Sequence, residues 1–331
     1  MARTKTTRPR RPKQAAGSRT PLWIGLAVLL VGALAALWFL REPERPAFDG
    51  ARAYAEVERQ VAFGPRVPGS EAHDAARRYF VETLTPLADQ VYEQPVAFTS
   101  ADSAFSVSGT NIVASFNLQP ERRIRVLLAA HWDSRPRADR DPDPAKRSRP
   151  VPGANDGASG VAVLLEIARI LHANPLGIGV DMILFDLEDL GTAEQVEADA
   201  AEARIPFAIG SAAFVRNNPT YRPTFGILLD MVGDRNLRIP KEGYSRAYAP
   251  RIVEKVWAAA ERVGAEAFVD EPGGAVEDDH VPFLRAGIPM VDLIHLPFPD
   301  TWHTTADTPE HVSAASLQQV GEVVVEVLWS E

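Results

Sequence analysis

The chain has 331 residues, 46% of them hydrophobic and 24% charged, a balance typical of a globular protein with a substantial core. Seven basic residues and no acidic residue fall within positions 1–20, so the rest carries 28 basic against 44 acidic residues and is a poor candidate for binding nucleic acid. The absence of cysteine excludes disulfides, thiolate ligands and a cysteine nucleophile, and leaves His and carboxylate side chains to hold any metal.

The N-terminal region contains one long apolar run. Residues 22–40 include no charge, and at about 1.5 Å per residue they span roughly 28 Å, close to the thickness of a bilayer core. Because the basic residues precede the run, we expect a basic cytoplasmic tail at 1–20, a transmembrane signal anchor at 21–41 and a domain at 42–331 on the periplasmic or extracellular side. A cleaved signal peptide is the alternative, but the apolar residues continue to position 40 and favour an anchor.

After residue 42 the hydrophobic pattern alternates between helix-like and strand-like segments. Helical patterns occur near 51–63 and 70–87, and later at 157–171, 210–217, 249–263 and 312–328. Strand-like apolar runs occur at 111–118, 124–131, 180–186, 225–231 and 288–295. Alternation of this kind is typical of a mostly parallel sheet covered by helices on both faces, and no change in composition marks a second domain. We therefore expect a single α/β domain.

Four of the predicted strands end in side chains that can bind a metal or carry a proton. The residues at or just after these strand ends are His131, Asp133, Asp186, Glu188, Asp189, Asp230, Asp234, His295 and, a few positions later, His303. In open α/β sheets, ligands gather at the carboxyl ends of the strands. The pattern therefore predicts a site at this edge of the sheet.

Several of the acidic residues also have an ordinary structural interpretation. Asp156, in the glycine-rich segment 153–160, could cap the helix that follows it. Glu188 and Asp189 could be solvated loop acids, although adjacent carboxylates repel each other unless a cation or a proton intervenes. Asp278 could simply favour the N-terminal dipole of a helix. None of these residues identifies a site by itself.

Two loop features remain open in the same way. His303 follows a proline-rich turn and could be either a surface residue or a ligand held in a fixed place. The segment 132–152 is charged and rich in proline, and it is either a mobile surface loop or a lid over the predicted site.

Six motifs follow one another along the chain: Ala-His-Trp-Asp-Ser at 130–134, Gly-Ala-Asn-Asp-Gly-Ala-Ser-Gly at 153–160, Phe-Asp-Leu-Glu-Asp at 185–189, Leu-Leu-Asp-Met-Val-Gly-Asp at 228–234, Glu-Asp-Asp-His-Val-Pro-Phe at 277–283 and Pro-Phe-Pro-Asp-Thr-Trp-His-Thr at 297–304. In this order they resemble the motifs of the glutaminyl cyclases, particularly the bacterial ones, and more broadly of the zinc aminopeptidases that share their fold. The resemblance covers roughly residue 51 to the C-terminus. It implies a three-layer α/β/α sandwich around a twisted, mostly parallel mixed sheet.

The resemblance to the cyclases also implies an activity and its residues. That activity is glutaminyl-peptide cyclotransferase, in which the amine of an N-terminal glutamine attacks its own zinc-polarised side-chain amide, giving pyroglutamate and ammonia. The implied ligands of one zinc ion are Asp156, Asp189 and His303. The implied catalytic acids are Glu188, which shuttles protons, and Asp230 and Asp278 beside it. The implied substrate-binding residues are Trp302 and Phe298, and the substrates are peptide or protein N-termini.

Two other functions stay open. A zinc aminopeptidase would bind a second zinc ion through His131 and Asp230, with Asp156 as the bridge, and would hydrolyse the first peptide bond. An inactive, membrane-tethered binding module is a third possibility. Trp302 before the metal-binding His favours the cyclase, because the aminopeptidases usually have Tyr there. The acidic, alanine-rich segment 191–209 departs from the cyclase pattern, which usually has aromatic and glycine-rich sequence near the pocket.

Overall fold

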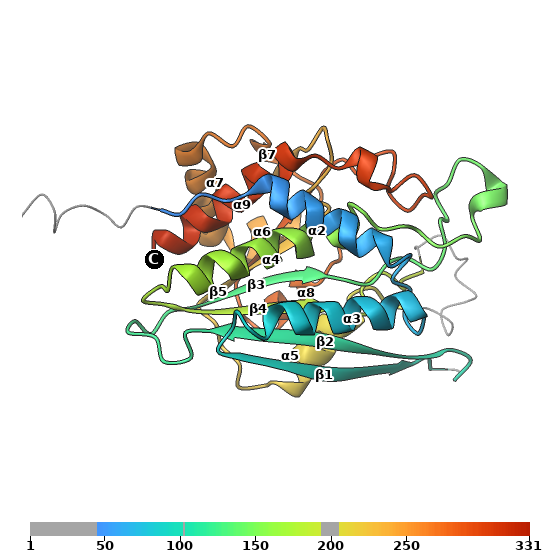
Figure 1. Cartoon of the computed structure of the whole chain (residues 1–331), viewed down its shortest axis with the longest axis horizontal. Helices are drawn as coiled ribbons and strands as arrows, with labels where there is room; N and C mark the ends of the chain where they lie inside the picture. The colour runs from blue at the N-terminus through green and yellow to red at the C-terminus, as the bar shows by residue number, and fades with distance from the viewer. Residues whose placement is uncertain (1–44, 102, 193–204) are drawn as a thin grey trace, which may run out of the picture. The chain divides into compact units, whose positions relative to one another are not determined.

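The computed structural model describes residues 45–101, 103–192 and 205–331 (Figure 1). The predicted tail at 1–20, the predicted anchor at 21–41 and most of the segment 191–209 lie outside these residues. No helix of the described chain combines the length and the apolar character needed to cross a membrane.

The centre of the fold is a mixed sheet of six strands in the order β1-β2-β4-β3-β5-β8. Its parallel part consists of β3 (Arg125–His131), β4 (Gly179–Phe185), β5 (Phe225–Asp230) and β8 (Met290–Ile294). Two antiparallel strands extend the sheet on one side, β1 (Gln90–Thr99) and β2 (Ser106–Phe116). Because β3, β4, β5 and β8 run in the same direction, their carboxyl ends lie at one edge.

Side chains of the parallel strands alternate between two buried layers, as the pleat requires. In β3, Val126, Leu128 and Ala130 pack in the larger cluster, whereas Leu127 and Ala129 pack in a second cluster on the other face. Both faces of the strand are fully buried. This explains why β3 is a continuous apolar run in the sequence rather than an alternating one.

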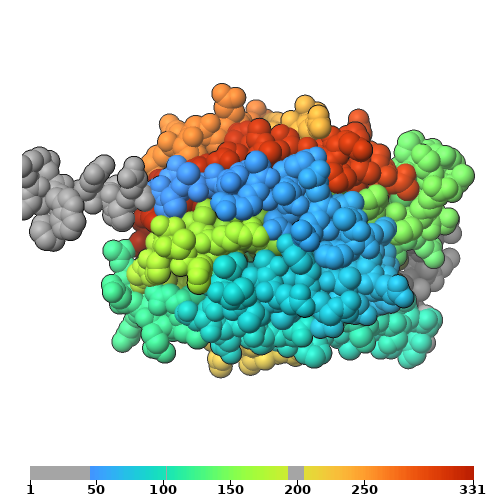
Figure 2. Space-filling view, viewed as in Figure 1, coloured from blue at the N-terminus to red at the C-terminus, as the bar shows by residue number. Residues whose placement is uncertain are grey.

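Helices cover both faces of the sheet. The larger cluster contains side chains from α2 (Gly50–Ala62), α3 (Glu71–Leu84), α4 (Ala158–Ala173), α7 (Pro250–Val263) and α9 (Ala314–Trp329). The opposite cluster contains side chains from α5 (Ile209–Asn217) and α8 (His280–Arg285). Figure 2 shows α2, in blue, packed between the red α9 and the yellow-green α4. The architecture is therefore the predicted three-layer α/β/α sandwich.

Short elements complete the described chain. They are β6 (Ile239–Lys241), which pairs in parallel with β7 (Phe268–Pro272), the helix α6 (Gly243–Tyr248), and the 3₁₀ turns η1 (Pro144–Lys146) and η3 (Pro309–His311). The five predicted strands correspond to β2, β3, β4, β5 and β8, so the prediction of an α/β fold with a mostly parallel sheet is confirmed. The pattern analysis missed β1, the first half of β2, and the β6–β7 pair.

Candidate metal centre

Asp156, Asp189 and His303 converge at the carboxyl edge of the parallel strands. Each is buried, and one potential ligand atom from each lies within 4.8 Å of those of the other two. The Nε2 atom of His303 is 3.3 Å from Asp189 Oδ1 and 3.7 Å from Asp156 Oδ2. The three residues come from separate segments, the turn before α4, the loop after β4 and the loop after β8.

This group has the donor chemistry of a divalent cation site. Asp156 Oδ2 and Asp189 Oδ2 are buried without a hydrogen-bond partner, and buried polar atoms normally have one. Two buried carboxylates this close also repel each other unless a positive charge lies between them. Two carboxylate oxygens and one imidazole nitrogen match the ligands of catalytic zinc sites that keep a fourth position open.

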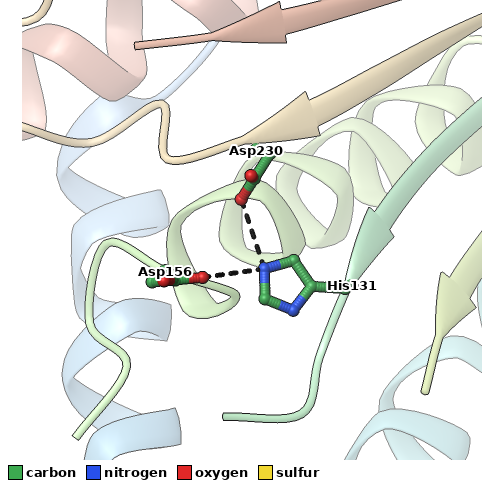
Figure 3. Close-up of side chains that lie close together, drawn as sticks. All are labelled: His131, Asp156 and Asp230. Carbon is green, nitrogen blue, oxygen red and sulfur yellow. Dashed lines mark hydrogen bonds and ion pairs between the residues drawn. The ribbon is translucent and has the colours of Figure 1, made fainter. Parts of the chain in front are cut away.

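A second group shares Asp156 with the first. His131 ends β3 and Asp230 ends β5, and His131 Nε2 lies 3.1 Å from Asp156 Oδ1 and 3.2 Å from Asp230 Oδ1 (Figure 3). Burial alone would lower the pKa of His131, but the neighbouring carboxylates of Asp133, Asp156 and Asp230 raise it well above its ordinary value. A protonated His131 therefore places a positive charge beside both carboxylates, whereas the aminopeptidase alternative needs the neutral imidazole as a ligand of a second zinc ion.

Asp156 reaches this position because it does not cap α4. The N-cap residue of α4 is Gly157, and no side chain caps that end. Gly157 has φ 93°, and a Cβ atom there would lie 2.7 Å from the carbonyl oxygen of Asp133, so only glycine fits without strain. The Asp307 carboxylate accepts hydrogen bonds from the backbone N–H groups of Asn155 (2.8 Å) and Asp156 (3.1 Å). The tight turn and Asp307 together direct the Asp156 side chain into the site.

The loop after β4 is held in the same manner. The Asp133 carboxylate accepts hydrogen bonds from the backbone N–H groups of Glu188 (3.1 Å) and Asp189 (3.2 Å). Leu187 before them has φ 59°, in the left-handed region that non-glycine residues seldom adopt. Sequence reasoning noted Asp133 only as a strand end and missed Asp307. Their positions in the sequence could have indicated a role in the site, because each lies a few residues from one of its histidines, Asp133 from His131 and Asp307 from His303.

Glu188, Asp230 and Asp278 form an acidic group beside the ligands. Burial raises the pKa of Glu188 well above its ordinary value; His131 opposes this shift and the charge of Asp278 adds to it. Burial, helped by the charge of Asp230, raises the pKa of Asp278 to about 7. Burial also raises the pKa of Asp230. The group can hold protons near neutral pH, as proton transfer between substrate groups requires.

A cleft of about 1290 Å³ opens onto both groups. Its lining includes Asp156, Asp189 and His303, the three acids, and the two predicted substrate-binding residues Trp302 and Phe298. The Trp302 ring lies 3.9 Å from the His303 ring and 4.2 Å from the Phe298 ring, measured between centroids. The Arg140 guanidinium lies 5.1 Å above the indole. The aromatic wall is therefore placed directly against one of the potential ligands.

A third group of potential ligands has a different character. His280 lies between two buried carboxylates, with Nε2 3.2 Å from Glu242 Oε2 and Nδ1 3.8 Å from Asp292 Oδ2. Opposite ring nitrogens face the two acids, and Glu242 Oε2 already accepts hydrogen bonds from the backbone and hydroxyl of Ser245. This geometry suits a buried imidazole bridging two carboxylates rather than an ion.

Comparison with known proteins shows which family and which solved structures the chain resembles. Residues 111–328 match Peptidase family M28. The crystal structure of Tannerella forsythia glutaminyl cyclase is 43% identical, with a TM-score of 0.80 over 86% of this chain and 100% of that one. A leucine aminopeptidase precursor from Bacteroides thetaiotaomicron is 41% identical, with a TM-score of 0.80 over 87% and 99% of the two chains. Glutaminyl-peptide cyclotransferase of Bos taurus is 25% identical over 292 residues, covering 78% of this chain and 76% of its own.

Proposed function

The chain belongs to Peptidase family M28, and from this premise we propose that it is a glutaminyl-peptide cyclotransferase that converts the N-terminal glutamine of peptides to pyroglutamate with release of ammonia. The observation that carries the proposal is the Asp156–Asp189–His303 group with the Trp302 indole stacked on its imidazole. The similarity to a solved bacterial glutaminyl cyclase over that enzyme's whole length supports it.

In the proposed reaction one zinc ion, held by Asp156, Asp189 and His303, would supply Lewis acidity to the side-chain amide of the substrate. The N-terminal amine attacks the amide carbon, so a new C–N bond closes the five-membered ring. Glu188 takes a proton from the amine and returns it to the departing nitrogen, and the C–N bond of the amide breaks to release ammonia. Asp230 and Asp278 line the same cleft as Glu188, and the negative charge of Asp278 favours the protonated form of Glu188.

The remaining cleft residues orient the substrate in this proposal. Trp302 and Phe298 present aromatic surface next to the ligand group, against which the aliphatic part of a glutamine side chain can pack. Their stacking fixes both rings before a substrate arrives, which reduces the entropy lost on binding. The cleft lining also includes the apolar side chains of Phe98 and Ile209, which can hold the residues that follow the glutamine.

A two-zinc aminopeptidase is the second candidate. The His131–Asp156–Asp230 group and the similarity to a leucine aminopeptidase precursor favour it. In that reaction Glu188 would activate a water molecule for attack on the first peptide bond. The two candidates differ in substrate, in product and in metal content.

One assay pair separates these candidates. The purified full chain is expected to release ammonia from peptides with N-terminal glutamine, to leave leucine anilide intact and to bind about one zinc ion per chain. Hydrolysis of the anilide with two zinc ions per chain would instead establish the aminopeptidase. Zinc binding without either activity would indicate the binding module. A Glu188→Gln chain is the control for contaminating enzymes.

We also propose that residues 21–41 anchor the enzyme in a membrane, with residues 1–20 in the cytoplasm and the catalytic domain at 42–331 outside it. The uncharged run and the basic residues on one side of it support this orientation. The substrates would then be N-termini of peptides outside the cytoplasm. The full chain should sediment with membranes, and added protease should digest its domain in spheroplasts. A chain without residues 1–41 should remain in the soluble fraction.

A further inference from the structure

The segment 135–141, within the predicted loop or lid, is fixed against the candidate metal centre by an ion pair between a buried arginine, Arg135, and the partly exposed Asp139. Arg135 is 5% exposed. Its Nε and Nη2 atoms donate to the two oxygens of Asp139, each at 2.8 Å. Such a fork is the strong, geometrically specific form of an arginine–carboxylate pair. The pair therefore acts as one rigid and electrically neutral unit.

Each half of this pair contacts one of the three proposed ligands. Arg135 Nη1 donates to Asp189 Oδ1 at 2.9 Å, and Nη2 donates to the carbonyl oxygen of Gly191 at 3.0 Å. Asp139 Oδ1 lies 3.6 Å from Nδ1 of His303, while Nε2 of the same ring faces Asp156 and Asp189. A carboxylate on the Nδ1 side favours the tautomer that carries its proton there, which leaves the Nε2 lone pair free for an ion.

Hydrogen bonds made by Arg140 and Asp141 hold the same segment beside His303. The Arg140 backbone N–H donates to the carbonyl oxygen of His303 at 3.1 Å. Asp141 accepts from the backbone N–H of Thr305 at 3.0 Å and from its hydroxyl at 2.6 Å. The segment is thus bound to the chain at His303 and just after it. These contacts fit a fixed wall of the site and not a lid that swings open.

We propose that Arg135 and Asp139 are positioning residues of the metal centre, with Arg135 orienting Asp189 and Asp139 orienting His303. The inference rests on the proposed zinc site but not on which reaction the site catalyses. Because the pair is neutral as a whole, its main effect on a bound cation is orientation and not charge. Loss of Asp139 alone removes the orientation of His303 and also leaves Asp189 as the only carboxylate paired with the Arg135 guanidinium.

The charges of Arg135 and Asp139 determine the expected order of zinc affinities among the variants. Arg135→Gln and Asp139→Asn should each weaken zinc binding by about 10- to 100-fold, the usual effect of removing a group that orients a ligand. Asp139→Asn should lower zinc affinity more than Arg135→Gln does, because the Arg135 guanidinium is then no longer balanced by Asp139 and repels the cation. The double variant should bind zinc more tightly than Asp139→Asn alone. Arg135→Lys should not restore affinity, because an ammonium group cannot form the fork.

The test uses the full chain and two readouts besides activity. Zinc affinity is measured by competition with a chelator, and the ligand field is measured from the visible spectrum of the cobalt-substituted protein. The matched control is the Arg125–Asp181 pair at the start of β3 and β4, with Arg125 Nη1 2.7 Å from a buried Asp181 carboxylate. Arg125→Gln and Asp181→Asn should lower the melting temperature and leave zinc affinity and the cobalt spectrum unchanged.

The outcomes separate this inference from the proposed activity. If the Arg135 and Asp139 variants lose stability like the control but keep zinc affinity within about twofold and an unchanged cobalt spectrum, the pair is only structural and the inference is wrong. If the wild-type chain binds no zinc, both proposals are wrong. If the order of affinities is found in a chain that hydrolyses leucine anilide, the positioning role stands and the cyclase assignment alone is overturned.

Discussion

Glu188, Asp230 and Asp278 lie in one buried region, where ionising all three carboxyl groups at once would be energetically unfavourable. Burial raises the pKa of each of them, that of Asp278 to about 7. Protons therefore stay on part of the group at neutral pH, and their distribution depends on every member. This is the property that proton transfer from an amine to a leaving ammonia requires. The same acids could transfer protons in a hydrolase. These residues therefore indicate proton transfer but do not by themselves identify the substrate.

Replacement of Glu188 tests its role in proton transfer. Glu188→Gln keeps the shape of the side chain but cannot take a proton, so kcat should fall by about 10²- to 10⁴-fold. Zinc content should stay the same, because Glu188 is not one of the proposed ligands. The matched control is Glu277→Gln, since Glu277 lines the same cleft but is exposed and pairs with Arg285. Retention of more than a tenth of the wild-type kcat by Glu188→Gln would assign the proton transfer to another group.

The pH dependence should reveal the coupling between Glu188 and Asp278. The charge of Asp278 contributes to the raised pKa of Glu188, so its removal in Asp278→Asn should lower that pKa. Glu188 would then remain deprotonated down to a lower pH, so the acid limb of the kcat/KM profile should move to lower pH. The maximal kcat/KM of the variant should also be reduced. The measurement is the profile of both proteins between about pH 5 and 9. An acid limb that moves to higher pH contradicts the proposed coupling.

The sequence predicted which side chains meet at the site but not what holds them there. Asp189 and His303 could be placed near one edge because parallel strands deliver their ends there. Asp156, and the grouping of the three as ligands, followed only from the resemblance to the glutaminyl cyclases. The roles of Asp133 and Asp307 could not be predicted, since their partners are backbone N–H groups of distant segments. Hydrogen bonds of that kind depend on how loops pack after folding, and no residue pattern records them.

Among the elements, α4 and β5 approach each other most closely at Gly160. A Cβ atom at Gly160 would overlap the carbonyl oxygen of Leu229, one residue before Asp230. Gly160→Ala should therefore lower the free energy of unfolding by about 1–3 kcal/mol, because helix or strand must shift. The measurement is urea unfolding.

The control for this close contact is Gly177→Ala. A Cβ atom there would have only Glu121 Oε2 within 4 Å, at 3.8 Å, and Gly177 does not have a left-handed backbone. Its unfolding free energy should change by less than about 0.5 kcal/mol. Equal effects of the two substitutions would show that helical or loop propensity, and not the approach of α4 to β5, accounts for the change.

Strands were predicted correctly where burial on both faces requires a continuous run of apolar residues. The strands β3, β4 and β5 are buried along nearly their whole length and appear as apolar runs. By contrast, β1 forms one edge of the sheet, has a mostly exposed pattern and contains Pro95, a residue that discourages assignment to a strand. Antiparallel pairing with β2 stabilises β1 as a strand, although its own sequence does not predict one.

At the scale of the whole described unit, the residues before α2 are attached to the C-terminal helix. Arg45 forms ion pairs with Glu322 and Glu326 of α9. Phe48 is buried, its ring fills the space above Gly321, and its backbone N–H donates to Glu322 at 3.0 Å. These contacts join the residues before α2 to α9 within the larger hydrophobic layer, so residues 45–49 are part of the folded unit.

This attachment predicts how the domain tolerates truncation. A chain of residues 45–331 should unfold in one cooperative transition, whereas a chain that begins at Asp49 keeps the N-cap of α2 but loses Phe48. Loss of a buried Phe costs about 3–5 kcal/mol, so the shorter chain should melt on the order of 10 °C lower. Phe48→Ala in the longer chain should reproduce most of this decrease, and Arg45→Ala little of it, because partly exposed ion pairs contribute at most about 1 kcal/mol. Equal melting temperatures for the two chains would mean that the N-terminal segment lies on α9 without stabilising the fold, and that the cooperative unit begins with α2.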